Sequence, residues 1–263
     1  LCGADVSTAE SRRIVAPHGL TIAGYSWPLF ACIAATLFLR CGSFGAGALL
    51  GFHLAYISRT FYPIDPTFVG LLTASFYAVE LLGAPISGSL GDRIGHRVFL
   101  LIGPIAGAIS AQILGMTTLL PMLFVVMAFK GLSSATSIPA TLAYLSFATR
   151  NNDAVRTRAL AWFEVANVAG IGVGGLLGGL FYSALGGWAF TAVAALYVLA
   201  FLLLWSMSGE TGPAVRRERR SLWSYRHLFQ SRSFVRFIPA WLCVNAFVGL
   251  WAAYTPFLLR NPV

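Results

Sequence analysis

The sequence predicts an all-α integral membrane protein, and three observations carry that prediction. Charged residues make up only 10% of the 263 residues, whereas a soluble domain has about 25%. The mean hydropathy is high, at +0.76. Several apolar stretches reach the roughly 20 residues that a helix needs to cross a bilayer. Helices are the expected spanning elements, because a helix satisfies its own backbone hydrogen bonds where water is absent.

Seven apolar stretches are candidate spanning helices. The first contains Arg40 within a glycine-rich segment. The connections from the third to the fourth stretch and from the fifth to the sixth carry no charge. In chain order, the candidates are residues 27–57, 67–90, 98–118, 120–148, 159–183, 188–208 and 237–259.

The basic residues predict which side of the membrane each connection faces. All of the 18 Lys and Arg residues are arginine except Lys130. Most lie in the N-terminal tail and in alternate connections, whereas Arg59 and Arg260 fall on the opposite side. Because cytoplasmic connections carry the excess of positive residues, we expect a cytoplasmic N-terminus in a multi-pass protein of the inner or plasma membrane. Topology alone explains the net charge of +9, so nucleic acid is not an expected partner. The basic segments are 1–26, 91–97, 149–158 and 209–236.

The cysteines indicate neither a disulfide framework nor a metal site. Three of the four lie inside apolar stretches, and together they show no metal-ligand spacing. We therefore expect no metal and no bound cofactor. The four are Cys2, Cys32, Cys41 and Cys243.

The segment GSLGDRIGHR, residues 88–97, joins the second and third candidate helices. It resembles the signature G-x-L-x-D-R-x-G-R-R of the major facilitator superfamily, with His96 where the family has another basic residue. The resemblance implies a gating turn: glycines permit a tight turn, and the charged side chains bond to neighbouring helices when the cytoplasmic side is closed. A positively charged turn without a gating role is the alternative. The matching residues are Gly88, Leu90, Asp92, Arg93, Gly95 and Arg97.

A glycine pattern in the fifth stretch resembles one found in proton-coupled exporters of the same family, G-x-x-x-G-P-x-x-G-G. Here the sequence is GIGVGGLLGG, and Gly175 stands where the family has proline. Glycines at every fourth residue let two helix backbones approach closely, so we expect a helix-packing motif. Generic packing of small residues is the alternative. The matching glycines are Gly170, Gly174, Gly178 and Gly179.

The resemblance also implies an architecture of two six-helix bundles with the transport path between them. The chain would supply the N-terminal bundle and the first helix of the second, and would be truncated. We expect a cytoplasmic tail (1–26), a six-helix bundle (27–208), a cytoplasmic loop between bundles (209–236) and a seventh helix (237–263). The basic loop is interpreted as a solvated linker, with a surface helix on anionic lipid as the alternative.

Ionisable residues within the apolar stretches form the candidate substrate and proton pathway. A charge at the bilayer centre costs at least about 2.5–3.5 kcal/mol, so such residues face a cavity or one another. At about 1.5 Å per helical residue, Arg40 and Glu80 both reach mid-membrane, where they could pair. Glu80 either exchanges protons or is a permanent partner of Arg40, and Tyr77 is a candidate cavity wall. The ionisable residues are Arg40, Glu80, Lys130 and Glu164.

Together, these features predict a secondary active transporter that works by alternating access and exports a small organic molecule in exchange for protons. An uptake carrier or uniporter for a sugar or metabolite is an alternative, and so is a non-transporting membrane scaffold or sensor. An enzyme is not expected, because the chain has no H-E-x-x-H, G-x-S-x-G or phosphate-binding loop. The expected partners are a small-molecule substrate and the lipid bilayer, and we expect a monomer that uses a proton gradient.

Overall fold

The computed structural model describes residues 21–22 and 25–207, together with Arg236, Pro239, Cys243 and Phe247. Apart from those single positions, the predicted inter-bundle loop and seventh helix lie outside the described residues. Most of the predicted N-terminal tail lies outside them as well. The described part contains the first six predicted helices.

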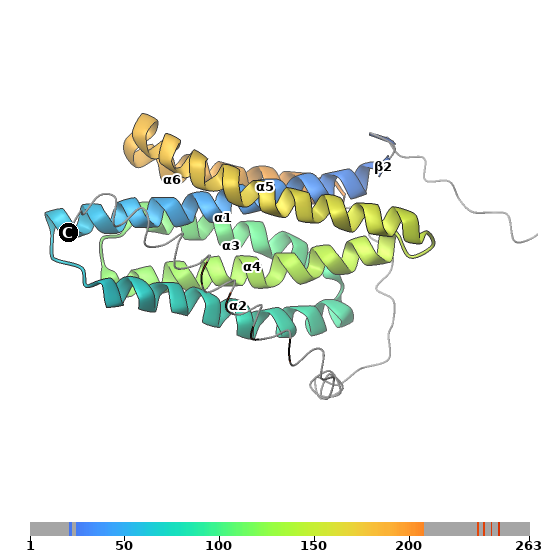
Figure 1. Ribbon diagram of the computed structural model, residues 1–263, viewed down its shortest axis with the longest axis horizontal. Coiled ribbons are helices and arrows are strands. Elements are labelled where there is room, and N and C mark those ends of the chain that lie inside the picture. The colour runs from blue at the N-terminus through green and yellow to red at the C-terminus, as the bar shows by residue number, and fades with distance from the viewer. Residues whose placement is uncertain are drawn as a thin grey trace, which may run out of the picture.

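Six α-helices follow one another in alternating directions (Figure 1). A 3-10 turn separates the last two, and a pair of two-residue antiparallel strands precedes the first. The sequence did not predict these strands. The elements are β1 (Thr21–Ile22), β2 (Tyr25–Ser26), α1 (Trp27–Thr60), α2 (Pro66–Ile94), α3 (His96–Met116), α4 (Leu120–Ala148), α5 (Asp153–Leu185), η1 (Gly186–Trp188) and α6 (Ala189–Ser206).

Five stretches of the described chain are long and apolar enough to cross a membrane. Four of them are α1, α2, α3 and α4, and the fifth runs through α5, η1 and α6 as one stretch. The predicted all-α architecture is confirmed in the described part. The total of seven spans stays a prediction.

The predicted connection at 91–97 is almost entirely helical, which corrects the predicted boundaries. α2 continues to Ile94 and α3 begins at His96, so Gly95 alone joins them. Its φ of 107° is a conformation that glycine adopts readily and other residues rarely do. Charged residues made the segment look like a loop, but long side chains at a helix end reach water without ending the helix.

The connection predicted at 149–158 is shorter than expected, because α5 already begins at Asp153. The side-chain oxygen of Asn152 accepts a hydrogen bond from the backbone N–H of Val155 at 3.1 Å, which caps the helix. The Asp153 carboxylate lies in the first turn, where the helix dipole favours negative charge.

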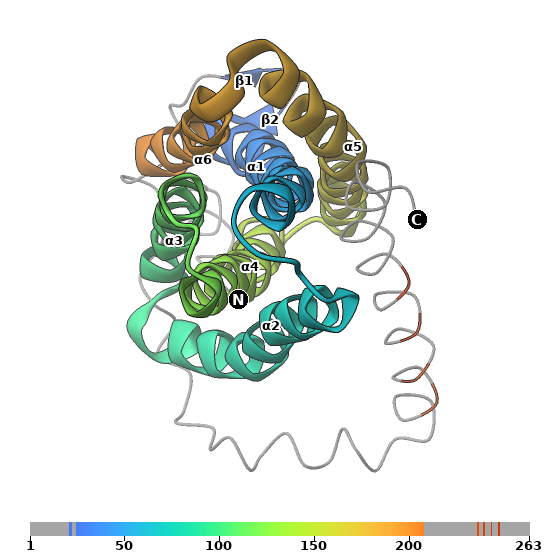
Figure 2. The same ribbon diagram turned by 90° about the vertical axis from the view of Figure 1, so that its left-hand side faces the viewer.

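The helices surround α1 and α4, which lie next to each other at the centre of the bundle (Figure 2). α1 packs on α5 and α6, α4 packs on α2 and α3, and α3 also packs on α6. Tyr197 of α6 is fully buried. Its ring occupies the space beside Gly42 of α1 and Gly107 of α3, where a Cβ atom at either glycine would collide with it. Three helices therefore meet around one aromatic side chain.

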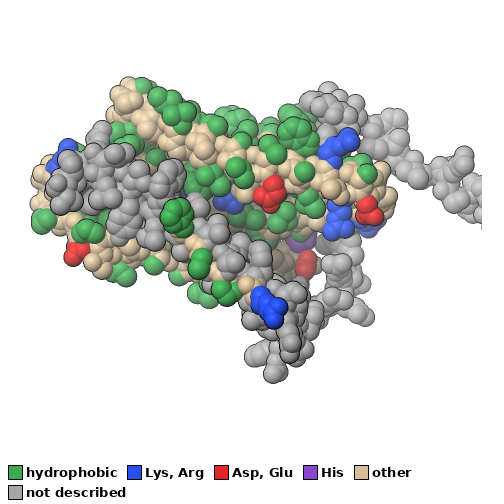
Figure 3. All heavy atoms as spheres, in the orientation of Figure 1, with side chains coloured by type: hydrophobic (Ala, Val, Ile, Leu, Met, Phe, Trp, Pro, Cys, Tyr) green, Lys and Arg blue, Asp and Glu red, His purple; other side chains and the backbone are tan. Residues whose placement is uncertain are grey.

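The surface of the bundle is largely apolar along its length. On the face shown in Figure 3, hydrophobic side chains and backbone cover the middle, and most charged side chains lie toward the two ends. The α2–α3 and α4–α5 connections lie at one end of the bundle and the α1–α2 connection at the other (Figure 1). The arginines of the first two connections are thus separated from Arg59 by the length of the helices.

Candidate functional site

A carboxylate is held between α2 and α4 in the middle of the described bundle. Glu80 of α2 accepts a hydrogen bond from the hydroxyl of Ser134 of α4 at 2.5 Å. Both residues are near the centres of their helices, and Glu80 is only partly exposed. Hydrogen bonds to charged groups are short and about twice as strong as neutral ones, so this contact fixes the carboxylate against α4.

Lys130 lies one helical turn before Ser134 on α4, and its amine is held between two other helices. The Nζ atom lies 5.2 Å from the ring centroid of Phe76 of α2, within cation–π range. On the other side, a Cβ atom at Gly47 of α1 would lie 3.3 Å from Nζ. The absence of a side chain at Gly47 therefore leaves the room that the lysine amine occupies. The Lys130 charge also interacts electrostatically with Glu80.

Arg40 of α1 completes the group of charges, but not by the contact that the sequence suggested. Its charge interacts electrostatically with the carboxylates of Glu80 on α2 and Glu164 on α5. No Arg40–Glu80 ion pair occurs in the described residues, so the suggested direct pair does not form. Helix depth placed the two residues at similar levels, but it could not show that Ser134 would bind the carboxylate instead.

Glu164 stands apart from this group on an exposed face of α5. Its carboxylate accepts a hydrogen bond of 3.4 Å from Asn167 one turn later. Tyr77 is adjacent to Phe76 on α2, with the ring centroids 4.8 Å apart. The polar group shared by α1, α2 and α4 thus consists of Arg40, Tyr77, Glu80, Lys130 and Ser134, and we call it the central cluster.

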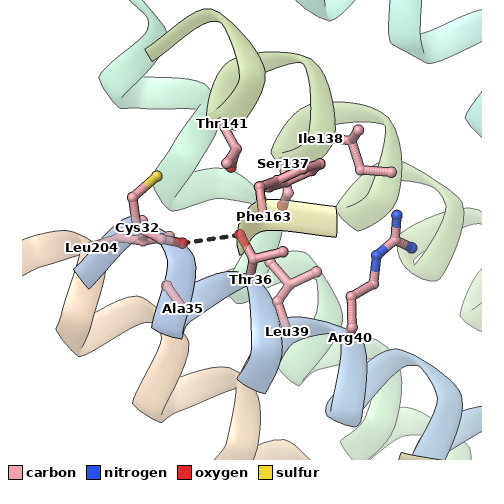
Figure 4. Close-up of a pocket in the computed structure, with 10 residues that line it drawn as sticks. All are labelled: Cys32, Ala35, Thr36, Leu39, Arg40, Ser137, Ile138, Thr141, Phe163 and Leu204. Carbon is pink, nitrogen blue, oxygen red and sulfur yellow. Dashed lines mark hydrogen bonds between the residues drawn. The ribbon is translucent and has the colours of Figure 1, made fainter. Parts of the chain in front are cut away.

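A small pocket opens beside Arg40, between α1 and α4 (Figure 4). Its volume is about 10 Å³. The Arg40 side chain extends from α1 toward Ile138 of α4 (Figure 4). The lining residues are Cys32, Ala35, Thr36, Leu39, Arg40, Ser137, Ile138, Thr141, Phe163 and Leu204.

Within the charged turn between α2 and α3, the side chains of His96 and Asp92 contact each other. His96 Nε2 lies 3.3 Å from the carboxylate of Asp92, one turn earlier in the chain. Gly91 is helical and buried. A Cβ there would lie 2.7 Å from Nδ1 of His96, so Gly91 makes room for the histidine ring. The turn itself is made at Gly95 alone.

The other residues of this motif occupy the helix ends. Arg93 lies in the last turn of α2, and Arg97 is the second residue of α3. Gly88 faces α4, where a Cβ would be 4.0 Å from the Cβ of Pro139, an ordinary contact distance. Within this motif, Gly88 is thus the residue at which α2 packs against α4.

The glycine pattern of α5 faces α1 along three consecutive turns. A Cβ at Gly174 would lie 2.5 Å from the carbonyl oxygen of Cys41, and one at Gly178 would lie 2.7 Å from that of Gly45. A Cβ at Gly170 would lie 2.5 Å from the Cβ of Arg40. Gly179, by contrast, has nothing within 4 Å of that position. Three of the four glycines therefore set the approach of the two backbones, and Gly170 supports the base of the Arg40 side chain.

Sequence reasoning missed one member of the central cluster, Ser134, and the neighbouring Gly47 that makes room for Lys130. Ser134 is an ordinary residue in a helix rich in Ser and Thr, and only its spacing of four from Lys130 marks it. Gly47 is one of many glycines in α1. Only the rotation of α1 against α4 shows that it adjoins the lysine.

The chemistry available to the cluster is that of protons and charges. Glu80 can bind and release a proton, and two cations on separate helices lie in its field. In the described part of the chain, no group of three or more His, Cys, Asp or Glu residues could hold a metal ion.

Comparison with known proteins connects this arrangement to one family. Multidrug resistance protein 1 of Bacillus subtilis (strain 168) is 26% identical over 177 residues, which are 66% of this chain and 45% of that protein. Tetracycline resistance protein, class C, of Escherichia coli is 34% identical over 164 residues, which are 60% of this chain and 40% of that protein. The matches thus span less than half the length of these relatives. The profile of the Major Facilitator Superfamily matches residues 20–261, and the chain therefore belongs to this family of multi-pass membrane proteins.

Proposed function

We propose that this chain forms part of a secondary active transporter that exports a small organic molecule in exchange for protons, by alternating access. Family membership supports transport, and the names of the relatives, which refer to multidrug and tetracycline resistance, support export. The family's two-bundle architecture supports the proposal that residues 27–208 form the first bundle, residues 209–236 the loop between bundles and residues 237–263 the start of the second. The path would then run along the face that the first bundle turns to the second.

The observation that carries the proposal is the central cluster itself. An ionisable group in the middle of a membrane is costly, and such groups mark pathways by default. Here a carboxylate and two cations lie on three different helices, with a hydroxyl and an aromatic ring in direct contact. A purely structural ion pair would need one acid and one base in contact, and Arg40 and Glu80 do not form it.

Each residue of the cluster has a proposed role. Glu80 carries the proton, and Ser134 orients its carboxylate. Arg40 and Lys130 stabilise the ionised form from two sides and contact polar groups of the substrate. Tyr77 forms part of the path wall, and Glu164 adds negative charge on α5.

The remaining parts of the chain fit the same scheme. The turn at Asp92, Arg93 and Arg97 is a latch at the cytoplasmic end, with Gly88 and Gly95 shaping it. The glycines at 170, 174, 178 and 179 belong to helix packing. The N-terminus is cytoplasmic, the protein is a monomer in the plasma membrane, and its driving force is a proton gradient rather than an enzymatic reaction.

The test is a transport assay with Glu80→Gln in inverted membrane vesicles from a host that lacks its own exporters. Tetracycline and a panel of cationic dyes are the probes, and a pH-sensitive dye reports proton movement when a probe is added. Probe-driven proton flux should fall at least tenfold in the variant, with the amount of protein in the membrane unchanged. Normal coupled flux in Glu80→Gln would remove Glu80 from the mechanism. Movement of the probes in the opposite direction would favour an uptake carrier.

A further inference from the structure

Lys130 and Glu80 carry opposite charges on adjacent helices, but they do not form an ion pair with each other. The Glu80 charge acts on the lysine electrostatically, and no ion pair between the two occurs in the described residues. The carboxylate binds the hydroxyl of Ser134 instead, and the amine lies over the ring of Phe76. Charged residues within membrane helices usually pair with one another, so the separation of these two needs a physical cause.

The two contacts form two successive levels between α2 and α4. These helices run in the same direction, because the helices alternate in direction along the chain (Figure 1). Phe76 and Glu80 are four residues apart on α2, and Lys130 and Ser134 are four residues apart on α4. Each residue of α2 thus contacts the residue of α4 at its own level. The levels are about 6 Å apart at 1.5 Å per residue, and the long, flexible side chain of a lysine can span that separation.

Close packing of the two backbones fixes the register of α2 against α4. A Cβ atom at Gly131 would lie 2.7 Å from the carbonyl oxygen of Phe76 and 2.9 Å from the Cβ of Val79. One turn further along, a Cβ atom at Gly83 would lie 3.0 Å from the Cβ of Ala135. Because these contacts fix the relative position of the two helices, side chains decide which group the lysine amine contacts.

The ring of Phe76 is the group that holds the amine. The Nζ atom of Lys130 lies 5.2 Å from the ring centroid, within the roughly 6 Å over which an aromatic face attracts a cation. This attraction is stronger where water is excluded, and both side chains are partly buried. The ring is itself packed against the ring of Tyr77, with the centroids 4.8 Å apart. On the other side of the amine, the absence of a side chain at Gly47 leaves the room that it needs.

We propose that Phe76 is a positioning residue, whose ring holds the Lys130 amine one helical turn away from Glu80 and so keeps the carboxylate available for proton exchange. An opposite charge in contact with a carboxylate favours its ionised form. A direct pair would therefore hold Glu80 ionised, whereas a lysine held over the ring acts on it only from a distance. The role in proton exchange rests on the proposed transport function, and the position of the lysine does not.

The other titratable groups that face Glu80 in the described part of the chain are on α1 and α2. Arg40 of α1 acts on the carboxylate electrostatically, and Tyr77 of α2 lies within its electrostatic range. The sequence of α4 contains no charged residue besides Lys130, and α3 carries its charged residues only in its first turn. Lys130 is therefore the cation whose distance from the carboxylate a change at Phe76 would alter.

The position of the lysine is tested by cross-linking, without any transport. Dicyclohexylcarbodiimide activates carboxyl groups within the membrane and joins them to a contacting amine as an amide, with release of dicyclohexylurea. Mass spectrometry measures the peptide linked through Glu80 and Lys130. Relative to the wild-type protein, Phe76→Leu should raise the yield of this link about threefold or more, because it loses the cation–π contact. Phe76→Met, a second apolar replacement, should do the same, and Phe76→Tyr, which keeps an aromatic face, should not change the yield.

Phe68→Leu is the matched control for this experiment. Phe68 lies about two turns earlier on α2, and its ring packs edge-on against Phe124 of α4, with the centroids 5.5 Å apart. The control thus removes aromatic packing between the same two helices without removing a cation–π contact of the described residues. It should give the wild-type yield of the link. Equal yields in Phe76→Leu and the wild-type protein, or an equal rise in Phe68→Leu, overturn the positioning role.

The pH profile of transport tests the consequence for proton exchange. In Phe76→Leu, the midpoint of the pH dependence of probe-driven proton flux should move about one pH unit toward acid, because a lysine in contact favours the ionised carboxylate. Phe68→Leu should keep the wild-type midpoint, even where its melting temperature falls. The double variant Phe76→Leu/Lys130→Met should have the same midpoint as Lys130→Met alone, since the lysine is then absent from both.

The two readouts separate this inference from the transport function on which it partly rests. An unchanged midpoint in Phe76→Leu, despite increased cross-linking, overturns the role in proton exchange. A shift of the same size in Phe68→Leu assigns the effect to packing and overturns that role as well. Normal flux in Glu80→Gln, with the expected cross-linking in the Phe76 variants, would instead defeat the transport mechanism and leave the position of Lys130 standing.

Discussion

The two sides of α1 are built in opposite ways. Toward α5, the contact is made by backbone and glycine, with Gly174 and Gly178 lying directly on the carbonyl groups of Cys41 and Gly45. Toward α2 and α4, the contact is made by long polar side chains around a glycine, with Lys130 lying against Gly47. The first interface leaves no room for an added atom, and the second encloses charges and a small pocket. A single helix thus joins a tightly packed seam to a polar interior.

Glycine has a different role in the two interfaces of α1. Both interfaces use missing side chains, but at the α5 seam the space is filled by another backbone, and at the cluster it is filled by a cation. Close backbone contact is a main source of association between helices in lipid, where the hydrophobic effect does not favour it. A cation at membrane depth is costly, and such residues are by default candidates for a functional site.

The largest effect is expected when Gly174→Ala, at the contact with α1, is compared with Gly175→Ala, outside that contact. Both gain the helix propensity of alanine, worth up to about 1 kcal/mol. A methyl group at Gly174 meets the backbone of Cys41 at 2.5 Å, and one at Gly175 meets nothing within 4 Å. Overpacking costs about 1–3 kcal/mol or more. We expect Gly174→Ala to melt several degrees lower in detergent and Gly175→Ala to equal or exceed the wild type. Equal melting of the two would show that the seam can relax.

Lys130→Met tests the polar side with a change that keeps the length of the side chain. The lysine amine contacts the Phe76 ring and forms no ion pair in the described residues, and an apolar side chain of similar length avoids the cost of a charge at membrane depth, so the melting temperature should be unchanged or higher. Transport of the probes should fall at least tenfold, because the cation facing Glu80 is lost. Gly47→Ala is the companion variant, since its methyl group would press on the lysine amine at 3.3 Å, and it should reduce transport by a smaller factor. A less stable Lys130→Met protein would assign the lysine to structure.

The smallest expected effect lies outside both interfaces, at the start of α2. The carboxylate of Asp65 accepts a hydrogen bond from the backbone N–H of Thr67 at 2.7 Å. This hydrogen bond lowers the pKa of Asp65. A lowered pKa in the folded state stabilises the protein above the unfolded value of about 3.9, and the contribution is lost as the pH falls through the folded value. Asp65→Ala should therefore lower the melting temperature slightly at pH 7, and this difference should shrink as the pH falls below the ordinary range of an aspartate and through the lowered folded-state pKa. Because the carboxylate is fully exposed, solvent screening keeps the effect small. A difference that persists at low pH would assign the effect to the alanine itself.

Much of the architecture could be predicted from hydropathy. The six helices of the described part fall where apolar stretches reach membrane length, because that length is set by the bilayer and not by packing. The ends were less predictable: Asp92 and Arg93 marked a loop, whereas the chain keeps them in the last turn of α2. Charge tells which residues reach water, and it does not tell where a helix stops.

The depth of the site residues along their helices could be predicted from the sequence, but the rotation of the helices about their own axes could not. Counting residues placed Arg40 and Glu80 at the same level, and the structure shows them within electrostatic range. The direction in which each side chain points depends on how α1, α2 and α4 are turned about their own axes. That turn is set by contacts such as Gly170 on Arg40, which no single stretch of sequence contains. Ser134 and Gly47 could be found only once the helices were packed.

Only Gly95 lies between α2 and α3, and this leaves the chain no slack there. Consecutive Cα atoms across a trans peptide are about 3.8 Å apart, so the end of α2 cannot travel more than a few ångströms without pulling the start of α3. A displacement of Glu80 that tilts α2 would therefore also move the start of α3. The buried Tyr197, seated against α3 and α1, would then carry the displacement into α6.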